Sequence, residues 1–285
     1  ASTLTLSGNN SYTGSTTISA GTLSIAAITN GGVAGALGNS TNAAANLVLG
    51  GGTLLYTGSN GSSDRNFTLT ASTTSAINVS TSSTQLTISG TSASTNGSLT
   101  KTGSGTLLLT GENLHSGTTT VSAGTLAISG NISSSALSLS SGGIISAGNS
   151  TDVKKFTTSA LTIAGGSGYV FTIGNATGSV GTAGTDYDQI YSTGALSFSN
   201  TAAIPCTVYV SGNATGWTNN STYTWNIIST GNGGNLSGYN SANFTVNLNS
   251  FGVGSGDRTG TWDFGSASGN ITLTYAAATP NYFWD

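Results

Sequence analysis

Acidic and imidazole side chains that could take part in catalysis or metal binding are few in this chain and lie far apart along it. Asp186 and Asp188 are the one close pair of acids, and residues i and i+2 of a strand point to the same side. Such a pair could contribute to a Ca²⁺ site, but calcium takes about six to eight oxygen ligands. No further acids accompany the pair, so a solvated turn edge is the simpler interpretation. We predict no metal site and no cofactor.

His115 is the one histidine, so a nucleophile activated by histidine could form only around it, and no motif supports one. Cleavage of polysaccharides requires acids that converge on one bond, and the eight acids are scattered thinly. Nucleic-acid binding requires a basic stripe, and the chain has five basic residues in total. We therefore predict no catalytic residue, no enzymatic activity and no nucleic-acid partner.

Aromatic side chains offer a different kind of site. Trp217, Tyr223 and Trp225 lie close together in the sequence, and their rings could stack on the faces of sugars. The alternative is that these rings are buried in the core, where their large apolar area drives folding. A glycan contact at these three residues is the weaker of the two interpretations.

The composition indicates which elements must position these residues. Charged residues make up 5% of the chain, and it contains 43 glycines, 2 prolines and no methionine. Strong helix formers never recur at helical spacing over a dozen residues, whereas Leu, Ile, Val and Thr alternate in short runs. We expect an all-β protein with almost no helix. No apolar run approaches the length of a membrane-spanning helix, and nothing at the N-terminus is typical of a signal peptide.

Two segments of the chain are closely similar to each other. Residues 2–25 can be laid on residues 105–128 without a gap, so that Leu4 matches Leu107 and Gly14 matches Gly117. Each segment reads as three short strands separated by turns, in which glycine and asparagine supply the left-handed backbone conformations. Each therefore makes about one coil of a solenoid.

Both segments resemble the autotransporter-associated β-strand repeat, also called the passenger-associated repeat, of bacterial surface proteins. The first copy keeps the Tyr12-Thr13-Gly14 of the repeat pattern, whereas the second has His115 at the aromatic position. The resemblance implies a right-handed parallel β-helix, or β-solenoid, that is extracellular or on the cell surface after export.

The composition changes near the middle of the chain. Only Tyr12, Tyr56 and Phe67 are aromatic before Lys155, whereas all four tryptophans follow Phe156. We therefore divide the chain into a β-solenoid over 1–155, which contains both repeats, and an aromatic-rich β region over 156–285. The second region either continues the solenoid or forms a unit like a β-sandwich.

The ends of a solenoid expose unpaired backbone groups, which β-proteins normally block with charge, proline or a cap. No charged residue or proline precedes the first strand-like segment. We therefore predict that assembly edges lie at the two ends of the chain, at Thr3, Leu4, Thr5, Leu6, Tyr282, Phe283 and Trp284.

Together these features predict a secreted structural protein, a subunit of an extracellular fibre that assembles head to tail with copies of itself. The alternative is an adhesin or passenger module that binds glycans or other cell-surface material.

Overall fold

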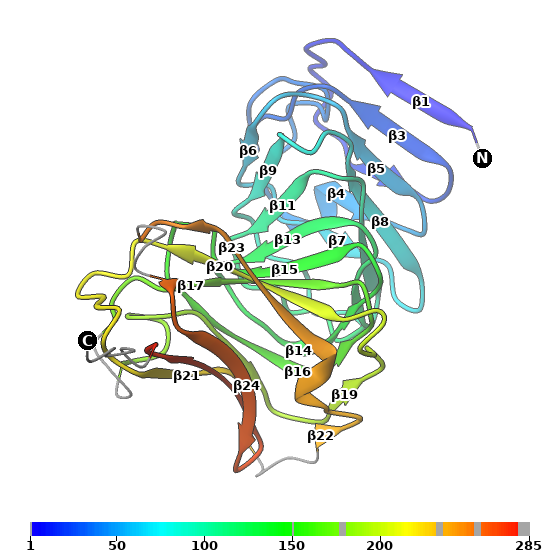
Figure 1. The fold of residues 1–285 in the computed structure, drawn as a ribbon. Helices are drawn as coiled ribbons and strands as arrows, with labels where there is room; N and C mark the ends of the chain where they lie inside the picture. The colour runs from blue at the N-terminus through cyan, green and yellow to red at the C-terminus, as the bar shows by residue number, and fades with distance from the viewer. Residues whose placement is uncertain (1, 150, 177–180, 232–235, 254–257, 279–285) are drawn as a thin grey trace, which may run out of the picture.

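A computed structural model of the chain describes residues 2–149, 151–176, 181–231, 236–253 and 258–278. The described residues form an all-β structure in which parallel strands are stacked from the N-terminal end to the C-terminal end (Figure 1). The prediction of an all-β chain with almost no helix is confirmed. Two short 3₁₀ helices are η1, Ala44–Asn46, and η3, Ser241–Asn243.

The largest of three sheets among the described residues has fourteen strands. Ten follow one another in parallel: β1 (Thr3–Leu6), β3 (Thr22–Ile25), β5 (Thr53–Tyr56), β8 (Thr74–Val79), β10 (Ser98–Thr102), β12 (Thr119–Val121), β14 (Ile132–Leu139), β16 (Lys155–Ile163), β18 (Gln189–Ser192) and β21 (Tyr223–Thr230). The other four are β25 (Asn270–Ala276) and β24 (Thr261–Ala267) at the far end, β19 (Leu196–Phe198), which pairs with β16, and β22 (Leu236–Ser237), which pairs with β19.

The second sheet has eight strands, and the third has three. The eight are β6 (Gly61–Ser63), β9 (Gln85–Ile88), β11 (Thr106–Leu109), β13 (Gly124–Ile128), β15 (Gly143–Ala147), β17 (Gly168–Thr172), β20 (Cys206–Gly212) and β23 (Phe244–Phe251). The three are β2 (Thr16–Ile18), β4 (Leu47–Leu49) and β7 (Thr68–Leu69).

The chain visits these sheets in turn and returns to each beside its previous strand, which is consistent with the expected β-helix. Leu107 of β11 lies beside Leu126 of β13, which lies beside Ile145 of β15. All three side chains are fully buried. Alternate residues of a strand face opposite sides, so the alternation of Leu and Ile with Ser and Thr places one apolar stack inside.

Both repeats close one turn of this arrangement, because the first strand of each pairs with its third. β1 pairs with β3 in the fourteen-stranded sheet, whereas β11 pairs with β13 in the eight-stranded sheet. Equivalent glycines stand at the start of the third strand, Gly21 directly before β3 and Gly124 as the first residue of β13, with φ of 69° and 62°. A Cβ on either would lie within 3 Å of a backbone oxygen, so glycine is required there.

The strands after residue 155 join the sheets of the first half. β16, β18 and β21 extend the large sheet, and β17, β20 and β23 extend the eight-stranded one. The turns of chain become longer: 19 residues separate Leu107 from its partner Leu126, whereas 39 separate Tyr169 from its partner Val208. Aromatic rings fill the wider interior, where Trp225 packs edge-on against Phe171.

A hairpin ends the large sheet at the C-terminal side. β24 and β25 are antiparallel and are joined by Ser268 and Gly269, both with positive φ. That backbone is typical of the tight two-residue turns that match strand twist. β25 then pairs antiparallel with β21. No helix of the described residues is long and apolar enough to cross a membrane.

Candidate functional site

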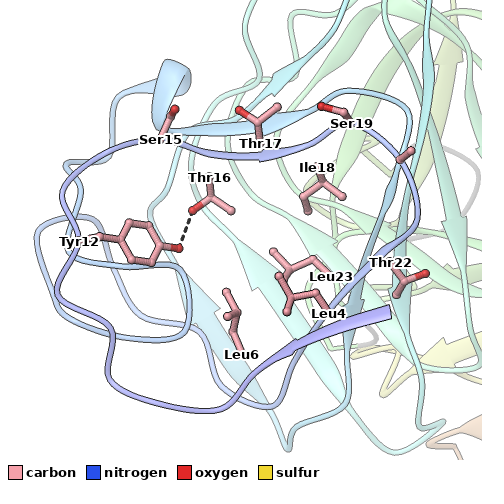
Figure 2. Close-up of a pocket in the computed structure, with 11 residues that line it drawn as sticks. Leu4, Leu6, Tyr12, Ser15, Thr16, Thr17, Ile18, Ser19, Thr22 and Leu23 are labelled. Atoms are coloured by element: carbon pink, nitrogen blue, oxygen red, sulfur yellow. Dashed lines mark hydrogen bonds between the residues drawn. The ribbon is translucent and has the colours of Figure 1, made fainter. Parts of the chain in front are cut away.

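The N-terminal end of the sheets carries the most exposed apolar strand. β1 is an edge strand of the large sheet, and the side chain of Leu4 is 62% exposed. Leu4 and Leu6 lie over a hollow of about 300 Å³, into which Ile18 and Leu23 of the same turn of chain also point (Figure 2). This hollow opens beside the edge strand β1, so the segment Thr3–Leu6 is exposed, and assembly through this edge stays a prediction.

A hydrogen bond between two hydroxyl groups orders the turn beside this hollow. Tyr12 Oη and Thr16 Oγ1 are 2.8 Å apart (Figure 2). In the second repeat, the equivalent His115 Nε2 and Thr119 Oγ1 are also 2.8 Å apart. The second repeat thus has histidine where the first has tyrosine, and this local contact is kept. Sequence reasoning did not single out Thr16 and Thr119, although both copies keep a threonine at this position.

The C-terminal end presents two outer strands, β23 of the eight-stranded sheet and β24 of the large one. Between them lies a hollow of about 580 Å³, whose walls include Phe244, Val246, Trp262 and Phe264. Three aromatic rings therefore line this hollow together with aliphatic side chains, and Asp263 stands at its wall. The other expected assembly edge, Tyr282, Phe283 and Trp284, lies outside the described residues.

The hairpin preserves the direction of the strands at this end. Every pairing along the large sheet from β1 to β21 is parallel. β25 is antiparallel to β21, and β24 is antiparallel to β25, so β24 again runs in the direction of β1. Another parallel turn of chain can therefore be added at either end without reversing its direction.

The three aromatic residues expected to contact glycans form one cluster. Trp217 stacks on Tyr223 with ring centroids 4.8 Å apart and on Trp262 at 5.8 Å. Tyr223 and Trp225 are 3% and 1% exposed, so their faces are covered by protein. Trp217 is half-buried. Tyr223 and Trp225 are therefore buried in the core, which was the alternative interpretation of these residues.

Asp186 and Asp188 do not converge on a common site. The Asp188 carboxylate is buried and accepts hydrogen bonds from the backbone N–H groups of Lys154 and Thr172, both at 2.8 Å. Burial raises the pKa of Asp188 to about 8. Asp186 instead accepts from the N–H of Thr182. No group of three or more potential metal ligands occurs in the described part of the chain.

His115 is fully buried, and its ring bonds on both sides. Nδ1 lies 3.1 Å from Ser92 Oγ, and Thr119, the partner of Nε2, bonds in turn to Ser135. Burial lowers the pKa of His115 to about 4, so the ring is neutral at pH 7. Because its members are all buried, this network joins neighbouring turns of the chain and does not face solvent.

Two of the five basic residues are also buried and hold turns together. The guanidinium of Arg65 donates to the carbonyl oxygens of Thr29, Asn30, Gly38 and Ser40. It thereby fixes the loop of residues 26–46 to the next turn. The ammonium of Lys101 donates to three carbonyl oxygens. Burial lowers the pKa of Lys101 to about 8. These two charged groups bind backbone carbonyl oxygens inside the protein and do not contribute to a charged surface.

Comparison with known proteins identifies the repeats. The model of the passenger-associated-transport-repeat family matches residues 1–25 and 99–128, which include both of the segments found in the sequence. An adhesin autotransporter, BmaC, of Brucella suis biovar 1 (strain 1330) is 50% identical to this chain over 124 residues. The matched segment covers 43% of this chain and 4% of the length of that relative. The chain thus carries the passenger repeats of bacterial autotransporter proteins, and after export its place is the cell surface or the space outside the cell.

Proposed function

We propose that the chain is a passenger module of an autotransporter adhesin, a rigid exported segment that contacts surfaces or glycans. Its similarity to an adhesin carries this proposal, and the low content of charged residues, 5% of the chain, is consistent with it. In this proposal the stacked turns form a right-handed parallel β-helix. Such a rod suits adhesion because parallel sheets hold side chains at fixed spacing over a long distance.

The adhesion proposal is tested with beads coated with the purified chain. Their retention on glass, on immobilised polysaccharide and on cultured cells is compared with that of beads carrying the same mass of albumin. We expect several-fold greater retention on at least one of these surfaces. Equal retention of the two kinds of bead on all surfaces would contradict the proposal.

Head-to-tail assembly into a fibre is a second candidate, favoured by the two ends described above. Leu4 is exposed at one end, the hollow beside β24 at the other end contains the apolar side chains of Phe244, Trp262 and Phe264, and both outer strands run in one direction. A contact between unlike ends propagates unless its rotation closes a ring. Negative-stain microscopy at rising protein concentration should show filaments. A strictly monomeric species at high concentration would overturn this candidate.

We also propose that the module acts without catalysis. The described acids are held by backbone N–H groups or lie apart, and His115 is buried. Incubation with polysaccharides should therefore release no reducing ends above the buffer control. A release that scales with protein concentration would refute this.

A further inference from the structure

The outer side of the eight-stranded sheet contains two adjoining hollows, of about 140 and 210 Å³. Both are lined by Val170 of β17, so they meet at that residue. The first begins at Gln85 of β9, and the second reaches Tyr209 of β20 and Ser250 of β23. Together they form a groove, here called the sheet groove, that crosses the strands from one end of the sheet towards the other.

The sheet groove has a periodic floor. Thr106, Thr125 and Ile144 lie side by side in successive strands. Ser146, Val170 and Tyr209 form a second column two residues further along the strands. Neighbouring strands lie about 4.8 Å apart. Only a ligand that repeats along its own length can use several positions of these columns at once.

Tyr209 provides a ring near the middle of this surface. It is half-buried on the outer side of β20, between the core residues Val208 and Val210. A Cβ on Gly168, in the neighbouring strand, would lie 2.6 Å from Tyr209 Cε2. The missing side chain at Gly168 thus lets the tyrosine ring lie across the adjoining strand. A ring in this position can stack on the apolar face of a sugar.

Ser146 supplies a polar group that the protein does not satisfy. Its side chain is 2% exposed and lines the smaller hollow, and its Oγ has no hydrogen-bond partner within the described ranges. A buried hydroxyl without a partner costs free energy, so an occupant of the hollow that bonds to it is favoured. Asn149 at the rim is held rigidly, because its Oδ1 accepts from the N–H groups of Thr151 and Asp152.

The lining of both hollows is without charge. It consists of hydroxyl, amide and aliphatic side chains and one phenol, and none is acidic or basic. Phosphate-bearing and carboxylate-bearing polymers need cationic partners, which are missing here. We propose that the sheet groove binds a neutral linear glycan that lies across the strands, with Tyr209 as the stacking platform and Ser146 as a hydrogen-bonding contact. This inference rests on the proposed adhesive function and names its ligand class.

Affinity electrophoresis of the full chain in native gels tests this inference. The gels contain dextran, galactomannan or mixed-linkage β-glucan, with polygalacturonate as the charged comparison. At least one neutral polysaccharide should slow the protein, whereas polygalacturonate should not. Tyr209→Ala should weaken that binding by about tenfold, the effect of losing one stacked ring. Ser146→Ala should weaken it to a smaller extent.

Tyr191→Ala is the matched control, because Tyr191 lies on the large sheet, where its ring faces the Lys155 ammonium at 4.8 Å. It should bind like the unmodified chain. Binding to no neutral polysaccharide, or equal binding by Tyr209→Ala, would overturn the inference. So would a dimer, seen by sedimentation, that depends on Tyr209, since the occupant would then be a second copy. If Tyr209→Ala beads still adhere like the parent beads, the adhesive function stands and the sheet groove is not its site.

Discussion

The two repeats have nearly the same sequence but occupy different surroundings. Leu4 of the first repeat is 62% exposed, whereas the equivalent Leu107 of the second is fully buried. Tyr12 is 38% exposed, and the equivalent His115 is fully buried. The reason is position: β1 has one neighbouring strand, whereas β11 lies between β9 and β13.

The comparison separates what a repeat determines by itself from what its neighbours supply. The bond from position 12 or 115 to the threonine four residues later has the same length in both copies, so the turn is set locally. Burial of the leucine and of the histidine requires a turn of chain on each side, since Ser92 and Ser135 come from adjacent turns. One turn folds to its shape locally but gains its stability from stacking.

Truncation of the two equivalent leucines should give the largest difference in stability between the two repeats. Leu107→Ala removes a fully buried side chain and leaves a cavity, so it should lower the free energy of unfolding by about 2–5 kcal/mol. Leu4→Ala, the matched control, should lower it by less than about 0.5 kcal/mol because Leu4 already faces solvent. Urea denaturation followed by tryptophan fluorescence measures both. Similar losses in the two variants would show that burial does not distinguish the repeats.

Much of the second repeat's structure could be predicted from the sequence, but its sheet could not. The alternation around Leu107 and the glycine at 124 predict three strands and a tight turn. Which sheet receives them depends on the neighbouring turn, because β11 pairs with β9 of the eight-stranded sheet, whereas β1 pairs with β3 of the large sheet. The loop of residues 26–46 lies between the two repeats. The contacts of Arg65 that fix this loop are long-range, so no local pattern reveals them.

The C-terminal hairpin was predictable, although it was not predicted. Two alternating runs flank Ser268 and Gly269, and a pair of such residues between two strand patterns is a hairpin signal. The sheet groove was not accessible in the same way. Ser146 and Tyr209 are 63 positions apart in the sequence, and only the stacking of β15, β17 and β20 brings their columns together.

Acid should destabilise the chain through the second repeat and not through the first. The folded state holds the pKa of His115 at about 4, against 6.5 for an ordinary histidine, so this contribution is complete above pH 6.5. As the pH falls from 6.5 to about 4, the unfolded chain binds a proton that the folded chain rejects, and stability declines. The loss should reach about 3 kcal/mol by the lower end of this range.

Urea denaturation at pH 7 and pH 4.5 measures this effect, with His115→Gln as the variant that lacks the titrating ring. When the pH is lowered from 7 to 4.5, the parent chain should lose more free energy of unfolding than His115→Gln does. Tyr12→His is the matched control, because a histidine at this exposed position should titrate alike in both states. A difference between the parent and His115→Gln that does not change with pH would contradict the buried, neutral state of His115.

The smallest effect on stability, and the most specific effect on assembly, is expected at the exposed end of the first repeat. Leu4→Lys places a charge on an edge strand, which is how natural sheets prevent pairing between edges. Because Leu4 is exposed, the free energy of unfolding should change by less than about 0.5 kcal/mol. Filaments that join at β1 should nevertheless disappear, since the charge would have to be buried against the next molecule.

Ile204→Lys is the control for this prediction. Its side chain is 57% exposed on a turn far along the chain, so this variant should leave filaments unchanged. If filaments persist in Leu4→Lys and vanish in Ile204→Lys, then assembly proceeds through the side of the molecule, and the open edge of the first repeat is covered by something other than a second copy.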